Sequence, residues 1–433
     1  MTPSPHAGPM HDAATNWSGN VRYAGRLHRP ASVDALRRLV AGSERIRALG
    51  SRHSFNRIAD GPGALVLLDG LPADIDLDTD RSTVTVAAGV RYAELAARLQ
   101  AAGRALPNLG SLPHISVAGS CATATHGSGD RNGCLATAVR ALELMTAGGD
   151  LVVVTGADPD FAGMVVALGA LGVVTRLTLA TEPAFDVRQY VYPDLPHERF
   201  AERHEQILGA AYSVSLFTTW TAPRFDQVWV KHRLDRPSPG TAAGAEPAPP
   251  WPGAVPAGAQ RHPIPGLPPR RCTVQLGVPG PWHERLPHFR AEFTPSSGDE
   301  LQSEYFVPRA RLPQAVAALD GMRDRIAPAL HIGEIRTVAA DELWLSPAYR
   351  RDSATIHFTW RSDPDAVPPV IDAVEERLAP LDARPHWGKL FGSRGADAIG
   401  RYERLDDFRR LLATHDPAGK FTNAFLDRLV RQI

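Results

Sequence analysis

Two segments rich in glycine, serine and threonine are places where the backbone could approach a ligand closely. The first, Gly50–Asn56, follows a predicted short strand, and its N–H groups could form a small arc that holds a pyrophosphate without lysine. The second, Leu109–Gly129, combines small side chains with hydroxyl donors. Either segment alone could be a plain turn or a tightly packed loop. Together they predict a dinucleotide cradle, which is not a Rossmann site or a P-loop because both of those motifs are missing from the sequence.

Polar residues alternate with apolar ones in two later strand-like segments. Glu334 and Arg336 would share one face of a strand, and His357 and Thr359 would share one face of another. Such pairs could line a pocket for a polyol, or they could be the solvent faces of an antiparallel sheet. Lys389 belongs either to the same pocket or to the surface, where its chain would lie along apolar neighbours.

The first 180 or so residues alternate between helix and strand patterns and predict a mixed α/β domain. Ser32 is placed to cap a helix that runs through Val40. The other elements expected here are the strands 46–50, 83–90 and 173–180, the helices 92–102 and 161–169, and a hairpin of 142–146 with 151–155.

From about Val187 the pattern changes to that of an α+β domain of about 200 residues. Its expected strands are 214–220, 227–232, 302–307, 332–338 and 355–360, and its expected helices are 312–326 and 367–378. The segment Pro237–Arg270 holds 11 of the 38 prolines and is expected to be a surface excursion or a disordered loop.

Composition excludes several classes of protein. The 47 basic and 47 acidic side chains cancel, so charge gives no reason to expect a nucleic acid or an anionic membrane as partner. Three cysteines without a CxxC pair argue against a disulfide framework or a cysteine zinc site, and no other metal site is predicted. Without a recognisable signal peptide or a long apolar run, a cytoplasmic protein is expected. Only three cations are lysines, and of these Lys231 is expected on a strand surface.

The Gly50–Asn56 loop resembles the pyrophosphate loop of the vanillyl-alcohol-oxidase superfamily of FAD enzymes, and the similarity is closest to the alditol oxidase (xylitol/sorbitol oxidase) family. The resemblance extends from about Asn16 to Leu426. The similar stretches are Ser111–Gly119, Thr125–Gly129, Gly169–Thr175, Pro279–Ser297, Ser303–Arg309, Glu334–Ala339, Arg384–Lys389 and Asp416–Phe425.

The resemblance implies one FAD per chain, attached through a single 8α-histidyl bond to His53. The resemblance also implies a set of residues that line the cofactor: Ala48, Leu49, Gly50, Ser51, Arg52, Ser54, Ser111, Ser116, Gly119, Thr123, Ala124, Thr125, His126, Val174 and His386. Arg52 departs from the family, which usually has a glycine there, so the loop needs backbone angles that an arginine can adopt. Cys121 lies about ten residues beyond the position used by doubly linked relatives and is interpreted as a packing residue.

For the substrate, the resemblance implies contacts from Ser111, Glu334, Arg336, Thr359 and Lys389. Arg336 and Lys389 would stabilise a developing alkoxide, Glu334 would orient a neighbouring hydroxyl, and His357 is a further catalytic candidate. The group that takes the hydroxyl proton is left open between a histidine near the flavin and a relay through Lys389. Gly110 would leave room for O2 beside the flavin, or it could be a turn glycine.

The expected fold is therefore α+β, with a VAO/PCMH-type FAD-binding domain and a substrate (cap) domain built on a large antiparallel sheet. The expected divisions are a tail at 1–15, the FAD-binding domain at 16–186, the cap domain at 187–410 and a returning segment at 411–433. The expected function is oxidation of the terminal alcohol of a polyol to an aldose, with hydride transfer to flavin N5 and reduction of O2 to H2O2. The alternatives are an aldonolactone oxidase or dehydrogenase and a non-catalytic flavin- or sugar-binding protein. The expected partners are the polyol and O2, with no nucleic acid or membrane, for a chain acting as a monomer.

Overall fold

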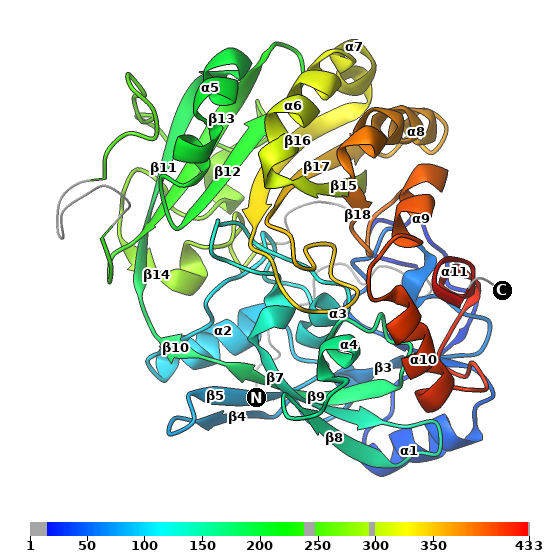
Figure 1. Ribbon diagram of the computed structural model, residues 1–433. Coiled ribbons are helices and arrows are strands. Elements are labelled where there is room, and N and C mark those ends of the chain that lie inside the picture. The colour runs from blue at the N-terminus through cyan, green and yellow to red at the C-terminus, as the bar shows by residue number, and fades with distance from the viewer. Residues whose placement is uncertain (1–14, 238–246, 294–298, 432–433) are drawn as a thin grey trace.

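The computed structural model describes residues 15–237, 247–293 and 299–431. Residues 1–14 of the expected tail, 238–246 of the proline-rich segment and 294–298 lie outside the described residues. The chain builds two sheet systems, one in the lower and one in the upper half of Figure 1, with α3 and the neighbouring loops between them. This arrangement agrees with the α+β, two-sheet architecture expected from the sequence.

The lower half contains a small parallel sheet and a five-stranded antiparallel sheet. The parallel sheet has the order β1-β3-β2, from β1 (Arg26–His28), β3 (Ala64–Leu67) and β2 (Ile46–Leu49). The antiparallel sheet has the order β4-β5-β9-β7-β8, from β4 (Ile75–Asp78), β5 (Thr83–Ala87), β9 (Val173–Ala180), β7 (Val139–Met145) and β8 (Leu151–Thr155). The short strands β6 (Arg104–Ala105) and β10 (Glu182–Pro183) pair separately.

The helices of this half are short: α1 (Val33–Gly42), α2 (Tyr92–Ala101), α3 (Val117–Ala122) and α4 (Phe161–Val165). Ser32 caps α1 as predicted, since its hydroxyl accepts a hydrogen bond from the Ala35 N–H at 3.1 Å. Helix α4 is shorter than the predicted 161–169, because Val166 already leaves helical geometry at φ −98° and ψ 71°.

The upper half is an eight-stranded sheet with the order β14-β11-β13-β12-β16-β17-β15-β18 (Figure 1). Its strands are β11 (Asp186–Pro196), β12 (Ser213–Thr218), β13 (Arg224–Arg233), β14 (Gly280–Pro281), β15 (Glu300–Pro308), β16 (Leu330–Val338), β17 (Ser353–Arg361) and β18 (Arg384–Pro385). All of its pairings are antiparallel, as predicted for this half.

Helices α5 (His197–Leu208), α6 (Leu312–Asp320), α7 (Arg323–Ile326) and α8 (Val367–Leu378) lie over the outer face of this sheet (Figure 1). Apolar residues that alternate along the strands, among them Ile335, Ile356 and Phe358, pack with these helices in one core. The predicted helix 312–326 is divided into α6 and α7, because Met322 leaves helical geometry at φ −128°. Polar partners of the alternation therefore face the other way, toward the lower half.

The described part of the proline-rich segment, 247–270, is mostly exposed and has little regular structure, as expected of a surface excursion, but a few of its residues are buried. Trp251 is 3% exposed and lies edge-on to Tyr192 at 5.8 Å, within the core of the upper half. His262 is buried, and its carbonyl accepts a hydrogen bond from the Gln227 amide at 2.8 Å. These few buried residues hold the segment against the upper half, while most of its other residues face solvent.

The end of the described chain returns to the lower half. Residues of α9 (Ser393–Ile399), α10 (Leu405–His415) and α11 (Ala424–Leu426) join the core formed by the first sheets. The domain boundaries remain a prediction.

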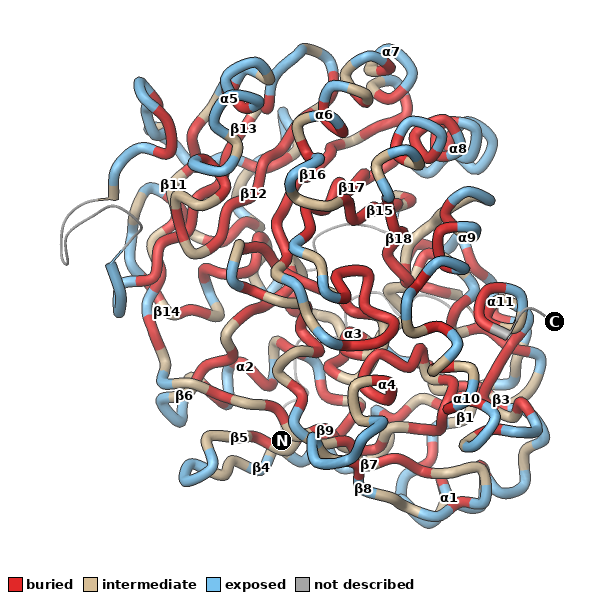
Figure 2. The backbone as a smooth tube through the Cα atoms, viewed as in Figure 1, coloured by how far each residue is buried: buried red, intermediate tan, exposed pale blue. Residues whose placement is uncertain are grey.

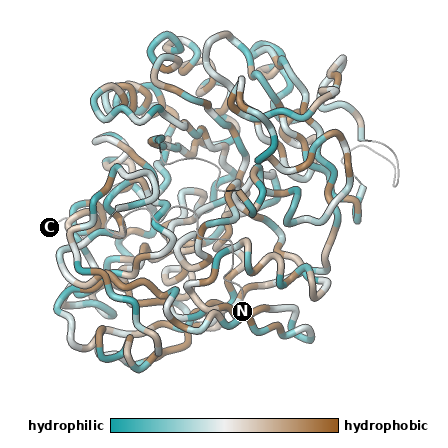
Figure 3. The backbone as a smooth tube through the Cα atoms, turned by 180° about the vertical axis from the view of Figure 1, so that it is seen from behind, coloured by the Kyte–Doolittle hydropathy of each residue, from teal (hydrophilic) through white to brown (hydrophobic). Residues whose placement is uncertain are grey.

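Figure 2 shows that the sheet strands are mostly buried, and Figure 3 shows hydrophilic and hydrophobic stretches alternating along the elements. Among the described helices, none combines the length and the apolar character that crossing a bilayer requires.

Candidate active site

A cavity of about 1080 Å³ lies between the Gly-Ser segments of the lower half and the inner face of the eight-stranded sheet. Every site residue predicted from the sequence lines it except Ala124. Ala124 is fully buried in the core beneath, with a left-handed φ of 52°. The cavity therefore joins the two sets of residues that the sequence presented as separate patterns.

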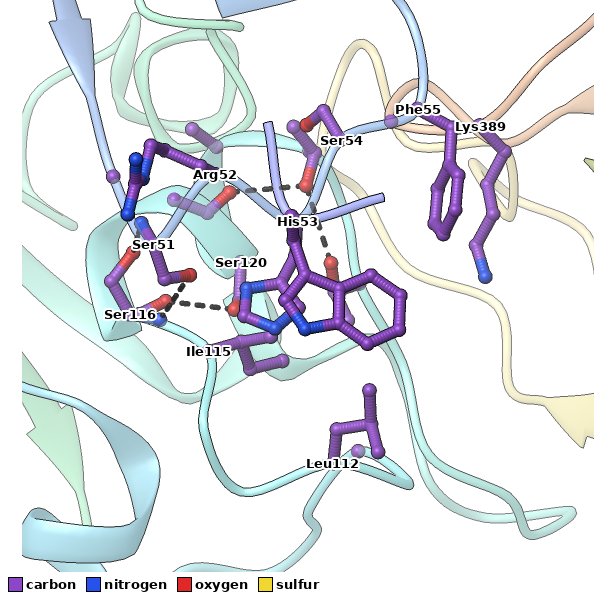
Figure 4. A pocket seen from close by; sticks show the side chains of 18 of the residues that line it. Ser51, Arg52, His53, Ser54, Phe55, Leu112, Ile115, Ser116, Ser120 and Lys389 are labelled. Atoms are coloured by element: carbon purple, nitrogen blue, oxygen red, sulfur yellow. Dashed lines mark hydrogen bonds between the residues drawn. The ribbon is translucent and has the colours of Figure 1, made fainter. Parts of the chain in front are cut away.

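The wall on the lower side is made by two loops that hydrogen-bond to each other (Figure 4). The Ser51 hydroxyl accepts from the Ser116 N–H at 3.0 Å, and the Ser116 hydroxyl accepts from the Ser51 N–H at 3.3 Å. A Cβ on Gly50 would lie 2.6 Å from the Ser116 oxygen, so only glycine allows the two loops this close. The predicted cradle is thus a surface of backbone and small side chains.

Arg52 occupies a strained position in this wall. Its φ is 62°, in the left-handed region that favours glycine. Its carbonyl accepts from the Trp17 N–H at 2.8 Å, and its guanidinium donates to the Thr15 carbonyl at 3.3 Å. The arginine is accommodated at the cost of backbone strain.

His53 lies in the middle of Figure 4, with Arg52 on one side and with Phe55 and Lys389 together on the other. Its ring stacks on Trp17 at a centroid distance of 5.3 Å. Burial, reinforced by the charge of Arg91, lowers the pKa of His53 to about 3 and keeps the imidazole neutral. Its buried Nδ1 has no hydrogen-bond partner within the described chain.

These features fit FAD. A neutral imidazole with an unused nitrogen is the form that can bond to an electrophilic carbon, and the paired loops leave a backbone-lined surface for a pyrophosphate. The cavity is also large enough for a dinucleotide and a small substrate.

The opposite wall carries buried charges from three neighbouring strands. Glu334 on β16, His357 on β17 and Glu304 on β15 stand side by side in one cross-strand row. Arg336 lies two residues along β16 from Glu334, and Thr359 two residues along β17 from His357. All five are buried and face the cavity, so the polar pairs are not a solvent face.

Glu304 is the hub of this wall, and the sequence analysis missed it. Its carboxylate accepts from Arg336 Nη2 at 2.7 Å and lies 3.1 Å from His126 Nε2, 3.4 Å from His357 Nδ1 and 3.5 Å from Lys389 Nζ. Burial alone would raise the pKa of Glu304, but Arg336, His126 and Lys389 hold it well below its usual range. The hub is therefore an anion that neutralises the cations around it.

Lys389 reaches this wall from the segment after β18. Its Nζ donates to Gln302 Oε1 at 2.6 Å and lies 3.1 Å from His357 Nδ1. Burial lowers the pKa of Lys389, and burial together with Lys389 lowers the pKa of His357 to about 4. His357 is thus a neutral imidazole beside a lysine.

Three potential metal ligands, His126, Glu304 and His386, have ligand atoms within 4.8 Å of one another. The oxygens of Glu304 already face Arg336 and Lys389, whose positive charges oppose a metal cation. The cluster is therefore an ion-pair network.

Other residues were missed or misplaced. Lys231 is not on a strand surface, because it is 1% exposed and its Nζ donates to the Leu286 carbonyl. His288, whose Nε2 is 2.7 Å from Glu334 Oε1, lies in an irregular segment that gives no periodic signal. Glu304 could have been found, since Gln302 and Glu304 repeat the polar alternation seen in the two other strands. Cys121 is buried against Tyr92, in agreement with a packing role.

Two models of known protein families match separate parts of this chain. Residues 26–155 match the FAD binding domain family, and residues 299–429 match the D-arabinono-1,4-lactone oxidase family. The solved structure of cholesterol oxidase from B. sterolicum has a TM-score of 0.75 at 16% identity and covers 99% of this chain and 100% of its own. The protein is an FAD-binding oxidoreductase with the vanillyl-alcohol-oxidase fold.

Full-length relatives narrow this class. An alditol oxidase from Streptomyces sp. (strain IKD472 / FERM P-14339) is 53% identical over 425 residues, which are 97% of this chain and 100% of the relative. An L-gulono-1,4-lactone dehydrogenase from Mycobacterium tuberculosis is 28% identical and covers 96% of this chain and 98% of its own. The chain belongs to the alditol oxidase family. The resemblance and the fold class expected from the sequence are therefore confirmed.

Proposed function

We propose that this protein is an FAD-dependent alditol oxidase that converts the terminal CH2OH of a polyol such as xylitol or sorbitol to an aldose and produces H2O2. The observation that carries the proposal is the pair of cations, Arg336 and Lys389, that face one cavity with the buried anion Glu304 between them. The cavity is buried enough for such charges to act strongly on a substrate oxygen. When bound, FAD supplies the two-electron chemistry, taking the hydride of the alcohol carbon and passing the electrons to O2.

Arg336 and Lys389 are proposed to stabilise the negative charge that grows on the substrate oxygen as its proton leaves. Arg336 is held from two sides, by Glu304 and by the Ser111 hydroxyl, which accepts from Nη1 at 3.2 Å. A cation fixed before the reaction stabilises developing charge without having to reorganise. Glu334 would accept a hydrogen bond from a second hydroxyl and fix the orientation of the polyol.

His357 is the proposed proton acceptor. Its low pKa keeps it neutral at pH 7, and Lys389 and Thr359 hold its two ring nitrogens at 3.1 and 3.0 Å. Because Lys389 contacts Nδ1, His357 would take the proton through Lys389, which gives one of its own protons to Nδ1 and receives the hydroxyl proton in its place. Ser111 and Thr359 would complete the contacts to the polyol hydroxyls.

We also propose the single covalent bond from His53 to FAD, and access of O2 past Gly110. An added Cβ at Gly110 would lie 3.6 Å from Ile115 Cδ1 and 3.7 Å from the His126 carbonyl oxygen. The position could hold a methyl group without a clash, so glycine leaves that space open to a small gas molecule. Because all of the residues named come from one chain, a monomer is proposed as sufficient. The three cysteines are free and buried, which fits the proposed cytoplasmic location.

The test is a peroxide assay of the purified flavoprotein in air with xylitol, sorbitol, mannitol and glycerol, beside aldonolactones. Peroxide from the polyols is expected. Rapid dye reduction without peroxide would contradict the oxidase, and turnover of lactones alone would favour the aldonolactone activity that the match over residues 299–429 leaves as second candidate. A protein that holds flavin but turns over no substrate would be a binding protein.

Acid precipitation tests the covalent bond separately. Flavin should remain in the yellow pellet of the wild-type protein and appear in the supernatant of His53→Ala. Release of all flavin from the wild type would exclude His53 as the point of attachment.

A further inference from the structure

His288 closes a ring of hydrogen bonds and one ion pair around the proposed polyol site. Its backbone N–H donates to the Ser111 carbonyl at 3.1 Å, and its side-chain Nε2 lies 2.7 Å from Glu334 Oε1. Arg336 completes the ring, because Nη1 donates to the Ser111 hydroxyl at 3.2 Å and Nε lies 3.5 Å from Glu334 Oε1. The ring connects the loop of the lower half to strand β16 of the upper half.

Lys231 and Glu334 contact the two ring nitrogens of His288 from opposite sides. The Lys231 ammonium, on β13, donates to the carbonyls of Leu286 and Pro287 at 2.5 and 3.1 Å, and it lies 3.2 Å from His288 Nδ1. Burial lowers the pKa of Lys231 to about 7 and would raise that of Glu334, but Arg336 and His288 hold the pKa of Glu334 well below its usual range. The Glu334 carboxylate only accepts, so Nε2 of His288 donates and Nδ1 faces the lysine. Burial lowers the pKa of His288 to about 4, and its single proton is then on Nε2, directed at Glu334.

The imidazole of His288 is also fixed by two aromatic neighbours. Phe217 and Trp229 meet it edge to face, at centroid distances of 5.4 and 5.3 Å. Phe217 is the cross-strand partner of Glu334. The pairing of β12 with β16 therefore places an aromatic neighbour of His288 beside the carboxylate that His288 contacts. Such packing restricts the ring to one orientation.

We infer that His288, held by Lys231, is a positioning residue that aims the Glu334 carboxylate at a hydroxyl of the polyol next to the reacting CH2OH. Because the bond from His288 goes to Oε1, the other carboxylate oxygen is the one that can accept from the substrate. An ionised carboxylate only accepts hydrogen bonds, so Glu334 would select a hydroxyl donor. The inference rests on the proposed function, since it assigns a substrate contact of that same site.

The test compares His288→Leu with His288→Gln in the flavin-loaded enzyme. His288→Leu should raise KM for xylitol on the order of 10- to 100-fold, as expected for loss of a hydrogen bond to a charged group, with a much smaller change in kcat. His288→Gln should recover most of that loss, because the glutamine amide can donate from nearly the position of Nε2. His283→Gln is the matched control, since His283 lies on the same segment but does not line the cavity, and its KM should stay at the wild-type value.

A double-mutant cycle with Glu334→Ala shows whether His288 acts through Glu334. The two losses should not add, so the double variant should have nearly the KM of Glu334→Ala alone. Flavin absorbance and melting temperature confirm that each variant is folded. Additive losses, an unchanged KM in His288→Leu, or no rescue by His288→Gln would each overturn the inference. Wild-type turnover is measured first, so a failure of the proposed function would appear before any variant is compared.

Discussion

The two walls of the cavity bind by different physical means. The lower wall is built of backbone and small side chains, with Gly50, Ser51 and Ser116 in close contact. The upper wall is built of buried charged groups, with Glu304 and Arg336 in direct contact at 2.7 Å. The shape of the backbone wall depends on the backbone angles that each residue can adopt. The stability of the charged wall depends on how well each buried charge is neutralised by its neighbours.

The charges of the upper wall are balanced within the site itself. Two carboxylates, Glu304 and Glu334, face two cations, Arg336 and Lys389, all in contact or nearly so. Removal of one charge should therefore affect the other three. In the lower wall, by contrast, a substitution should change stability mainly through the backbone φ that the new residue has to adopt.

The largest effect is expected from Glu304→Gln. The substitution leaves Arg336, His126 and Lys389 beside a neutral amide, and the free energy of unfolding should fall by about 3–5 kcal/mol, as for one partner removed from a buried ion pair. Chemical denaturation of the flavin-loaded protein measures it. Glu342→Gln, the same change in the exposed ion pair with Arg350 outside the cavity, is the control and should cost less than about 1 kcal/mol. Equal losses in the two variants would show that Glu304 is not a hub.

Lys389→Met should lower kcat/KM by about 100- to 1000-fold, the loss typical of one group that stabilises a developing oxyanion. The flavin should remain bound, because Lys389 belongs to the substrate wall. Lys420→Met is the matched control, since the Lys420 side chain donates to the Val40 and Ala147 carbonyls outside the cavity. Its specific activity per bound flavin should be unchanged, and normal turnover in Lys389→Met would remove the proposed role.

The buried histidines predict a dependence of stability on pH. The pKa values of His288 and His357 are lowered to about 4 in the folded protein, from about 6.5 in an unfolded chain. Their neutral forms therefore stabilise the fold fully above pH 6.5, and this stability is lost as the pH falls from about 6.5 through 4. The free energy of unfolding, measured at half-unit steps, should decline across this window and decline less steeply in His288→Gln. A flat profile between pH 6.5 and 4 would contradict the prediction.

The smallest effect tests the backbone of the lower wall. Arg52→Gly should be more stable than Arg52→Ala by about 1 kcal/mol, because both lose the guanidinium but only glycine relieves the left-handed φ, at some cost in unfolded-chain entropy. Thermal unfolding of the two variants measures the difference. If Arg52→Ala were the more stable, the strain at this position would be negligible.

Much of the local structure follows from the sequence. The Ser32 cap, the alternation along β16 and β17, and the hairpin of β7 and β8 are short-range patterns, and they appear where predicted. The end of α4 and the break between α6 and α7 were missed because they depend on single non-helical residues. The burial of Trp251 and His262 within the exposed proline-rich segment was missed because composition does not reveal what a neighbouring sheet will cover.

The sequence by itself presented two sets of residues, small residues with His53 and alternating polar pairs with Lys389, and the family resemblance predicted FAD for the first and a polyol for the second. Only the tertiary structure decided that they face one cavity, that Glu304 joins the charges, and that Lys231 is buried behind His288. The reason is that side-chain alternation is set within one strand, whereas the partner of a buried charge comes from a distant strand or loop. Strand order and loop packing choose that partner, and a local pattern carries no information about either.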